Sequence, residues 1–186
     1  MAVSTYIALL RGINVGGKNT VRMEALRQMF ERLGFDCVQT YIQSGNVVFK
    51  STEDTKSVQQ RIEQEFGQVF GFAVTVLVRT LEELAELVAH CPFSEEELEE
   101  AVAASAAESL YVAFLRQAPG PDDIEKLSAY RNESEKFQIQ GRDVFLLFYQ
   151  GIRNSKLANH LDKLGIPMTV RNWNTVNKLA ALARCK

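Results

Sequence analysis

The sequence has few of the residues that usually mark a disulfide framework or a metal site. Its three cysteines (Cys37, Cys91 and Cys185) are odd in number and widely separated, which argues against a disulfide framework. Its two histidines, His90 and His160, have no second histidine or cysteine at ligand spacing. We therefore expect no zinc site, no other metal and no cofactor.

Long apolar runs and a large excess of one charge are also missing. No apolar stretch approaches the ~20 residues that a helix needs to cross a bilayer, and the N-terminus lacks the pattern of a secretion signal. We therefore expect a cytoplasmic protein with reduced thiols and no membrane association. The net charge of −2 argues against a protein whose whole surface binds nucleic acid, although a local basic patch is compatible with it.

What is present is an ordinary globular composition with an uneven distribution of charge. The 186 residues, 46% hydrophobic and 24% charged, are enough for one sizeable domain or two small ones. Residues 80–109 contain nine acidic side chains and no Lys or Arg, whereas residues 151–186 contain seven Lys or Arg and one acidic residue, Asp162. The chain thus has an acidic middle and a basic end.

Hydrophobic periodicity predicts two series of alternating strands and helices. Both series have the order βαββαβ, the ferredoxin-like arrangement, and a last helix follows the second. In the first series the strands are residues 5–11, 38–43, 47–49 and 73–79, and the helices are residues 22–33 and about 58–70. In the second series the strands are residues 110–115, 136–140, 143–149 and 168–171, and the helices are residues 122–131, 155–164 and 174–184.

Between the two series the sequence predicts a helical connection. Thr80 with Glu83, and Ser94 with Glu97, have the spacing of capping boxes, so two helices start there and the second continues to Glu108. We therefore predict an α+β fold, a tandem of two ferredoxin-like units with extra helices. Residues 1–79 form the first unit, residues 80–109 the acidic helical connection, and residues 110–186 the second unit with the C-terminal helix. The two halves share the order of their elements, not their residues.

The strands are apolar on both faces. Residues 6–10 and 144–149 leave neither side of a sheet polar. Because a sheet of this kind carries its helices on one face, the second face is expected to be covered as well. The other half, the extra helices or a second subunit could provide that cover.

The glycine-rich stretch Arg11–Asn19, between the first strand and the first helix, is the best candidate site. Its glycines allow close backbone approach, and N–H groups at a helix start favour an anion. Gly12, Gly17 and Lys18 fit the spacing of a phosphate-binding P-loop, but Asn19 replaces the Ser or Thr that binds magnesium, and the βαββαβ order is not that of those ATPases. A looser anion site remains, and the alternative is a tight turn alone. The predicted ligand-binding residues here are Arg11, Asn14, Gly16, Gly17, Lys18 and Asn19.

Two further polar clusters complete the predicted site. Tyr41 lies near the end of the second strand, and Ser44 and Asn46 lie in the turn that follows it, where the end of strand one and the start of strand three are expected to meet. The alternative for them is turn chemistry alone. The other cluster combines two helix starts with basic groups, and its alternative is two helix caps and a packed tryptophan. It consists of Ser155, Lys156, Arg171, Asn172, Trp173, Asn174 and Lys178.

Four segments carry a resemblance to a known family. They are residues 6–19 (YIALLRGINVGGKN), 40–49 (TYIQSGNVVF), 155–157 (SKL) and 169–179 (TVRNWNTVNKL). Together they resemble the bacterial family called domain of unknown function 1697, over nearly the whole chain. The resemblance implies two ferredoxin-like units and implies no activity, because none is established for that family.

Three hypotheses for function follow. The first is a site for a small anionic ligand, phosphorylated or carboxylated, at the glycine-rich loop and the basic C-terminal segment, and it leaves open whether the protein is an enzyme. The second is a nucleic-acid-binding module that uses the basic C-terminal third. The third is a protein-interaction or oligomerisation domain whose partner covers the second sheet face. The sequence does not define the oligomeric state.

Overall fold

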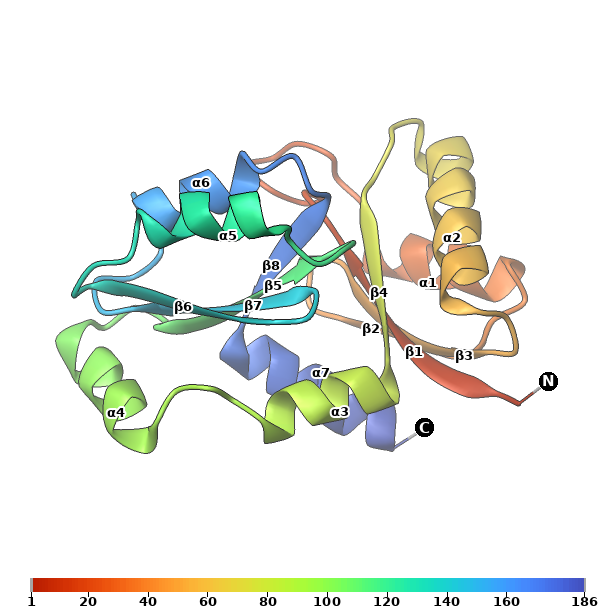
Figure 1. Ribbon diagram of the computed structural model, residues 1–186. Coiled ribbons are helices and arrows are strands. Elements are labelled where there is room, and N and C mark those ends of the chain that lie inside the picture. Colours follow the sequence, from red (N-terminus) through yellow and green to blue (C-terminus); the bar gives the residue numbers. More distant parts are fainter. Residues whose placement is uncertain (1, 186) are drawn as a thin grey trace. The chain divides into compact units, whose positions relative to one another are not determined.

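A computed structural model describes residues 2–185 of the chain (Figure 1). Within these residues the fold is mixed α+β, with two four-stranded antiparallel sheets and seven helices. The chain divides into two compact units. The first comprises Met1–Ala89 with Asn177–Lys186, and the second comprises His90–Val176.

The first unit has a sheet of strand order β2-β3-β1-β4. Every neighbouring pair in it is antiparallel, and Leu9 of the central strand β1 is paired with Asn46 at the start of β3. The elements in chain order are β1 (Ser4–Leu10), α1 (Met23–Arg32), β2 (Asp36–Tyr41), β3 (Asn46–Ser51), α2 (Thr55–Phe70), β4 (Val76–Thr80) and α3 (Leu81–Ala89).

Alternation along β1 divides the core of the first unit between two sheet faces. Tyr6, Ala8 and Leu10 belong to one buried cluster with side chains of α1 and α2. Ile7 and Leu9, which point to the opposite face, are fully buried, and α3 packs on β1 and β4. The expected cover on the second face is therefore present within the chain.

The second unit has a sheet of strand order β6-β7-β5-β8, again antiparallel throughout. Its elements in chain order are α4 (Glu95–Ala104), β5 (Leu110–Leu115), α5 (Pro121–Ser128), β6 (Glu135–Gln140), β7 (Asp143–Phe148), α6 (Lys156–Asp162), β8 (Met168–Asn172) and the start of α7 (Trp173–Arg184). The division between the units falls within α7, since Asn177 and the residues after it belong to the first unit.

The core of the second unit follows the same alternation. Ala113 and Leu115 of β5 cluster with side chains of α5 and α6, including Leu127 and Leu161. Val112, Phe114, Phe145 and Leu147 point to the other face and are also buried, and α4 packs on β7. The central strands β1, β3, β5 and β7 are therefore buried on both faces, which explains their long apolar runs, whereas the edge strands β2 and β6 are more exposed and more polar.

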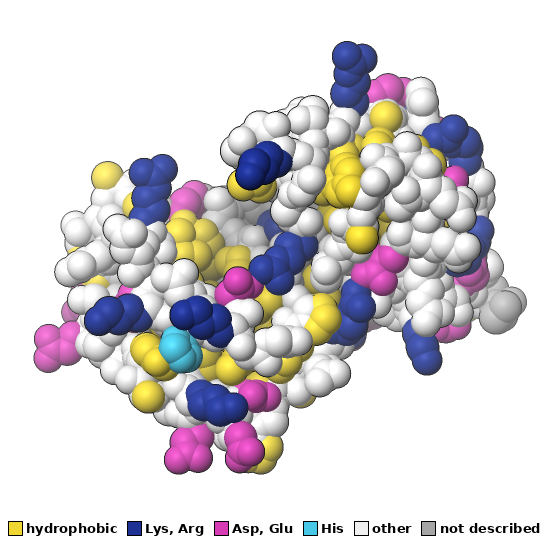
Figure 2. Space-filling view, turned by 90° about the horizontal axis from the view of Figure 1, so that it is seen from above, with side chains coloured by type: hydrophobic (Ala, Val, Ile, Leu, Met, Phe, Trp, Pro, Cys, Tyr) yellow, Lys and Arg dark blue, Asp and Glu magenta, His cyan; other side chains and the backbone are white. Residues whose placement is uncertain are grey.

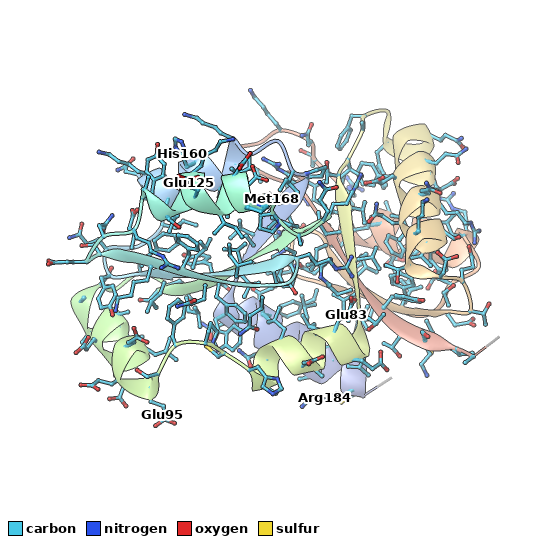
Figure 3. All side chains as sticks on the ribbon, in the orientation of Figure 1. Glu83, Glu95, Glu125, His160, Met168 and Arg184 are labelled. Atoms are coloured by element: carbon cyan, nitrogen blue, oxygen red, sulfur yellow. The ribbon has the colours of Figure 1, made fainter. Side chains whose placement is uncertain are left out.

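Both predicted capping boxes are present. The N–H of Glu83 donates to Oγ1 of Thr80 at 3.2 Å and the N–H of Thr80 donates to Oε2 of Glu83 at 2.9 Å, at the start of α3 (Figure 3). Ser94 and Glu97 make the same reciprocal pair at the start of α4. These bonds satisfy N–H groups that the first helical turn leaves without partners.

The predicted extent of α4 was wrong, because the helix ends at Ala104 and not at Glu108. Ser105 has extended backbone angles (φ −150°, ψ 144°), and its Oγ accepts a hydrogen bond from the N–H of Ala107 at 3.1 Å. A serine that bonds the backbone two residues on competes with helical hydrogen bonds. Residues 105–109 therefore form an irregular segment that leads into β5.

No helix among residues 2–185 combines the length and the apolar character that crossing a membrane requires.

Candidate functional site

The stretch Arg11–Asn19 forms a small hairpin and not the start of a helix. Val15 and Lys18 form an antiparallel bridge, with the N–H of Lys18 donating to the carbonyl of Val15 at 3.0 Å. Gly16 (φ 58°) and Gly17 (φ 73°) form the two-residue turn between them. A two-residue turn with both φ angles positive is the hairpin turn that glycine favours.

The glycines are therefore remote from the helix that follows. Helix α1 begins at Met23, and its N-cap residue Arg22 makes no side-chain capping bond. The glycines thus form a turn of their own and not the first turn of α1, and the anion site at this loop stays a prediction. The hairpin favours the alternative, in which the glycines make a tight turn, and any anion at this loop has to bind the turn itself.

Asn14 anchors the hairpin from its base. Its Nδ2 donates to the carbonyls of Val21 (3.0 Å) and Gln43 (2.8 Å), and its Oδ1 accepts from the N–H of Val21 (2.7 Å). Asn19 adds one bond, from Nδ2 to the carbonyl of Gly12 at 3.1 Å. These three bonds involve both atoms of the Asn14 amide, which gives Asn14 a role in positioning the loop.

The first two predicted clusters, residues 11–19 and 41–46, meet at one end of the first sheet, where β1 ends and β3 begins. The N–H of Leu10 donates to the carbonyl of Gly45 at 2.8 Å, and a Cβ placed on Gly45 would lie 2.7 Å from Cδ1 of Ile13. Asn46 is fully buried and donates from Nδ2 to the carbonyl of Tyr41 (3.0 Å) and to Oγ of Ser44 (2.9 Å). Residues 11–19 and 41–46 thus form one packed structure, which we call the loop pair.

The loop pair contains an unusual number of left-handed residues. Four glycines have positive φ angles, and so do three residues that are not glycine: Asn14 (55°), Asn19 (51°) and Ile42 (48°). Asparagine tolerates this conformation, but a β-branched residue is strained in it. Ile42 is also 47% exposed. Sequence reasoning missed it, because nothing in the local pattern marks an isoleucine as left-handed.

The exposed tip of the loop pair carries a positive charge. Lys18 is exposed and has no ion pair among residues 2–185, and no hydrogen bond within that range engages the N–H groups of Gly16 and Gly17. Val15, beside them, is 64% exposed. The tip therefore presents one cation and two backbone donors to solvent.

The third predicted cluster consists largely of helix caps and a buried arginine. Oγ of Ser155 accepts from the N–H of Ala158 at 2.9 Å and caps α6. Helix α7 is capped by Asn172, whose Oδ1 accepts from the N–H of Thr175 at 2.9 Å, whereas the sequence predicted a helix that starts at residue 174. The difference arises because α7 begins at Trp173, directly after β8.

Arg171 lies inside the second unit. It is 8% exposed, and its Nη1 donates to Oγ1 of Thr169 at 2.7 Å and to the carbonyl of Val170 at 3.0 Å. Burial lowers the pKa of its guanidinium to about 10, since desolvation penalises the charged form. These contacts point to a structural role for Arg171. Lys156 and Lys178 are exposed, and Lys178 belongs to the first unit.

A pocket of ≈ 500 Å³ lies within the second unit. Its lining includes Trp173 and Asn174, two residues of the predicted site, and Glu108, which the sequence did not single out. Nδ2 of Asn174 donates to Oε1 of Glu108 at 2.8 Å, and the Trp173 ring lies 6.0 Å from that of Phe145, between centroids. A carboxylate at this position disfavours an anion near Trp173. Glu108 was missed because the end of α4 was placed four residues too late.

Other reactive groups do not form a site. No group of three or more His, Cys, Asp or Glu side chains in the described part of the chain is arranged to hold a metal. Burial raises the pKa of the half-buried Cys91 thiol, which lowers its reactivity at neutral pH. His160 stacks on Tyr130 with ring centroids 3.7 Å apart.

The fold defines the class of the protein, an α+β protein with two four-stranded antiparallel sheets. Comparison with known proteins gives its family. A family model described as "protein of unknown function (DUF1697)" matches residues 3–145. The chain belongs to this family, as its sequence suggested, and the match includes the first two of the four segments, residues 6–19 and 40–49. No curated protein sequence matched the chain.

Two solved structures were also found. The conserved bacterial protein SP0830 from Streptococcus pneumoniae has a TM-score of 0.74 and 26% sequence identity, with 98% of this chain and 99% of that chain covered. An unknown protein from Galdieria sulphuraria has a TM-score of 0.29 and 9% identity, over 92% of this chain and 99% of that chain. The first supports the same fold for this chain.

Proposed function

We propose that the chain is a tandem of two ferredoxin-like units and that its loop pair binds a small anionic ligand, phosphorylated or carboxylated. The proposal about the fold is supported by the βαββαβ order of each unit and by the equivalent order of strands in the two sheets. In each unit the last strand also leads directly into a helix, α3 or α7.

Equivalent hydrogen bonds support a repeated unit. The bond from the N–H of Leu10 to the carbonyl of Gly45 (2.8 Å) has a counterpart between Leu115 and Arg142 (2.9 Å). The next residues are also equivalent, because the N–H of Arg11 donates to Thr75 at 2.9 Å and that of Arg116 to Pro167 at 2.8 Å.

The residues of the first strands correspond as well. YIALLR (residues 6–11) aligns with YVAFLR (residues 111–116), with Tyr, Ala, Leu and Arg identical at four of the six positions. The expectation that the halves share order alone overlooked this similarity. Pairing registers agree with the alignment, since Tyr6 lies opposite Thr80 and Tyr111 opposite Asn172. Thr80 and Asn172 each cap the helix that follows.

The anionic ligand is supported by one observation, the hairpin tip of the loop pair. It holds the exposed Lys18 beside the N–H groups of Gly16 and Gly17, on a base fixed by Asn14. Glycine turns with outward N–H groups and a nearby cation favour phosphate or carboxylate. A fixed base also reduces the ordering cost of binding.

The test is a titration with inorganic phosphate, ATP and citrate, followed through the backbone amide resonances of Gly16, Gly17 and Lys18. We expect these resonances to shift saturably. Replacing Lys18→Ala is expected to weaken binding by about three- to tenfold, since one partly solvated charge contact contributes up to roughly 1 kcal/mol. Lys56→Ala on α2 is the matched control, because Lys56 is exposed and outside the loop pair.

Two outcomes would count against the proposal. One is that no probe shifts the three resonances at millimolar concentration, and the other is that Lys56→Ala weakens binding as much as Lys18→Ala. A shift on α6 with short nucleic acids at low salt would instead favour the nucleic-acid alternative. That alternative has weaker support. Figure 2 shows Lys and Arg side chains around a histidine on the face that carries α5 and α6, but acidic side chains lie among them.

A further inference from the structure

The pocket of the second unit has the size of a small-molecule site. It lies between α4, residues 105–110 and the first residues of α7, and all of these belong to the second unit. Its volume of ≈ 500 Å³ falls within the range of roughly 300–1,000 Å³ that is typical of ligand pockets. The pocket exists because α4 ends at Ala104 and an irregular segment returns to β5.

Most of the pocket lining is apolar. Leu98 and Val102 contribute from α4, and Leu110 contributes from the start of β5. Val102 is 67% exposed, which is unusual for a side chain of this kind on a solvated helix. Trp173 adds the face or edge of an indole ring. An apolar body is therefore the natural occupant of most of this volume.

The charge of the pocket is negative. Among the described residues that line it, Glu108 alone carries a charge, and the bond from Asn174 holds its carboxylate in place. Helix α4 adds five further glutamates, of which Glu95 points away from the sheet (Figure 3). Residues 80–109 contain no Lys or Arg, and among these glutamates Glu97 is paired with Lys136 of β6. The local potential therefore attracts a cation and repels an anion.

We propose that this pocket binds a small organic cation, an ammonium group attached to an apolar body, with Glu108 as its counter-ion and Trp173 as its aromatic contact. Carboxylates pair with ammonium groups, and tryptophan is the aromatic side chain that attracts cations most strongly. Leu98, Val102 and Leu110 hold the apolar body. The site is separate from the loop pair and takes a ligand of opposite charge.

Trp173 provides a direct readout, because it is the one tryptophan in the sequence. Its fluorescence is titrated with three probes of similar size and different charge: 2-phenylethylammonium, the neutral 2-phenylethanol and the anionic 3-phenylpropionate. We expect a saturable change with the ammonium probe and at least fivefold weaker binding of the alcohol. The carboxylate probe is expected not to bind.

Two isosteric variants distinguish the effect of the Glu108 charge inside the pocket from the general electrostatic effect of the acidic helix α4. Glu108→Gln keeps an acceptor for Asn174 and is expected to weaken the ammonium probe about three- to tenfold while leaving the alcohol unchanged. Glu100→Gln removes the same charge from an exposed position on α4 that does not line the pocket, and is expected to have no more than a twofold effect. Methyl resonances of Leu98 and Val102 report occupancy independently.

The proposal is overturned if the three probes bind equally, if none perturbs Trp173 and the two methyl groups, or if Glu108→Gln and Glu100→Gln have the same effect. Ala106→Leu adds bulk to the pocket lining and provides a second variant. It is expected to weaken the ammonium probe and the alcohol alike. Binding that survives this substitution unchanged places the probes elsewhere and also overturns the proposal.

Discussion

Asn14 shows how one side chain fixes the shape of a loop. It adopts a left-handed backbone (φ 55°) and uses both atoms of its amide to join Val21 and Gln43, seven and 29 residues away. The hydrogen bonds tie the hairpin to the turn before β3. These bonds give Asn14 a structural role in the loop, and its contact with a ligand stays a prediction.

We expect Asn14→Ala to lower the free energy of unfolding by about 4 kcal/mol, because it removes three hydrogen bonds, at roughly 1 kcal/mol each, and places alanine in a left-handed conformation that costs about 1 kcal/mol more. Asn19→Ala has the same backbone penalty but removes one bond, so about 2 kcal/mol is expected. Denaturant unfolding of the two variants measures the difference. Equal losses would show that the amide bonds of Asn14 contribute little.

At the scale of elements, periodicity and capping patterns predicted every strand and helix in the correct order. The predicted ends of helices were wrong where a local polar contact determines the position at which the helix begins or ends. Ser105 ends α4 through its bond to Ala107, and Asn172 starts α7 one residue earlier than the sequence suggested. The left-handed Ile42 and the pocket beside Trp173 depend on contacts between distant segments, so no local pattern could predict them.

An ion pair connects α4 to the edge strand β6. Nζ of Lys136 lies 3.0 Å from Oε1 of Glu97, and this bond, together with the N-cap bond to Ser94, holds the pKa of Glu97 below its ordinary value. The folded protein therefore favours the carboxylate. The interactions of the Glu97 carboxylate contribute to stability above the pKa that Glu97 has in the unfolded chain, about 4.3. This contribution is lost as the pH falls through the lower pKa that Glu97 has in the folded protein.

We expect Lys136→Met to lower the free energy of unfolding at pH 7 by about 0.5 kcal/mol, the usual size for a partly exposed pair. The difference from the unmodified protein should shrink below about pH 4 and vanish near pH 2, where the carboxylate is protonated. Lys126→Met, at an exposed position of α5 outside any described ion pair, provides the control. A difference that is the same at pH 3 and pH 7 would contradict a role for the ion pair.

At the scale of the whole molecule, the division into two units crosses a continuous helix. Helix α7 starts beside β8 in the second unit, and its buried side chains Leu179, Ala180 and Ala183 belong to the first. The first unit is therefore built from both ends of the chain, with the second unit inserted between them. Such an arrangement predicts that a destabilising substitution in α7 also destabilises β1 and β4, which lie far from it in the sequence.

Leu179→Ala is expected to destabilise the first unit by about 2–4 kcal/mol, through the cavity that the missing side chain leaves. Amide exchange in β1 and β4 should accelerate more than exchange in β5 and β7. Leu161→Ala in α6 should produce the opposite pattern, because Leu161 lies in the core of the second unit. If each substitution accelerates exchange equally in both sheets, the two units open as one body.

The divided first unit also affects the order in which the chain can fold during synthesis. A ribosome completes residues 1–89 early, but residues 177–186 emerge only after the whole second unit has been made. Domains usually fold from the N-terminus as they are synthesised. Residues 1–89 contain all four strands and helices α1–α3 of the first unit, and only its part of α7 is added after the second unit. The part of the protein that is made first is thus the part that is finished last.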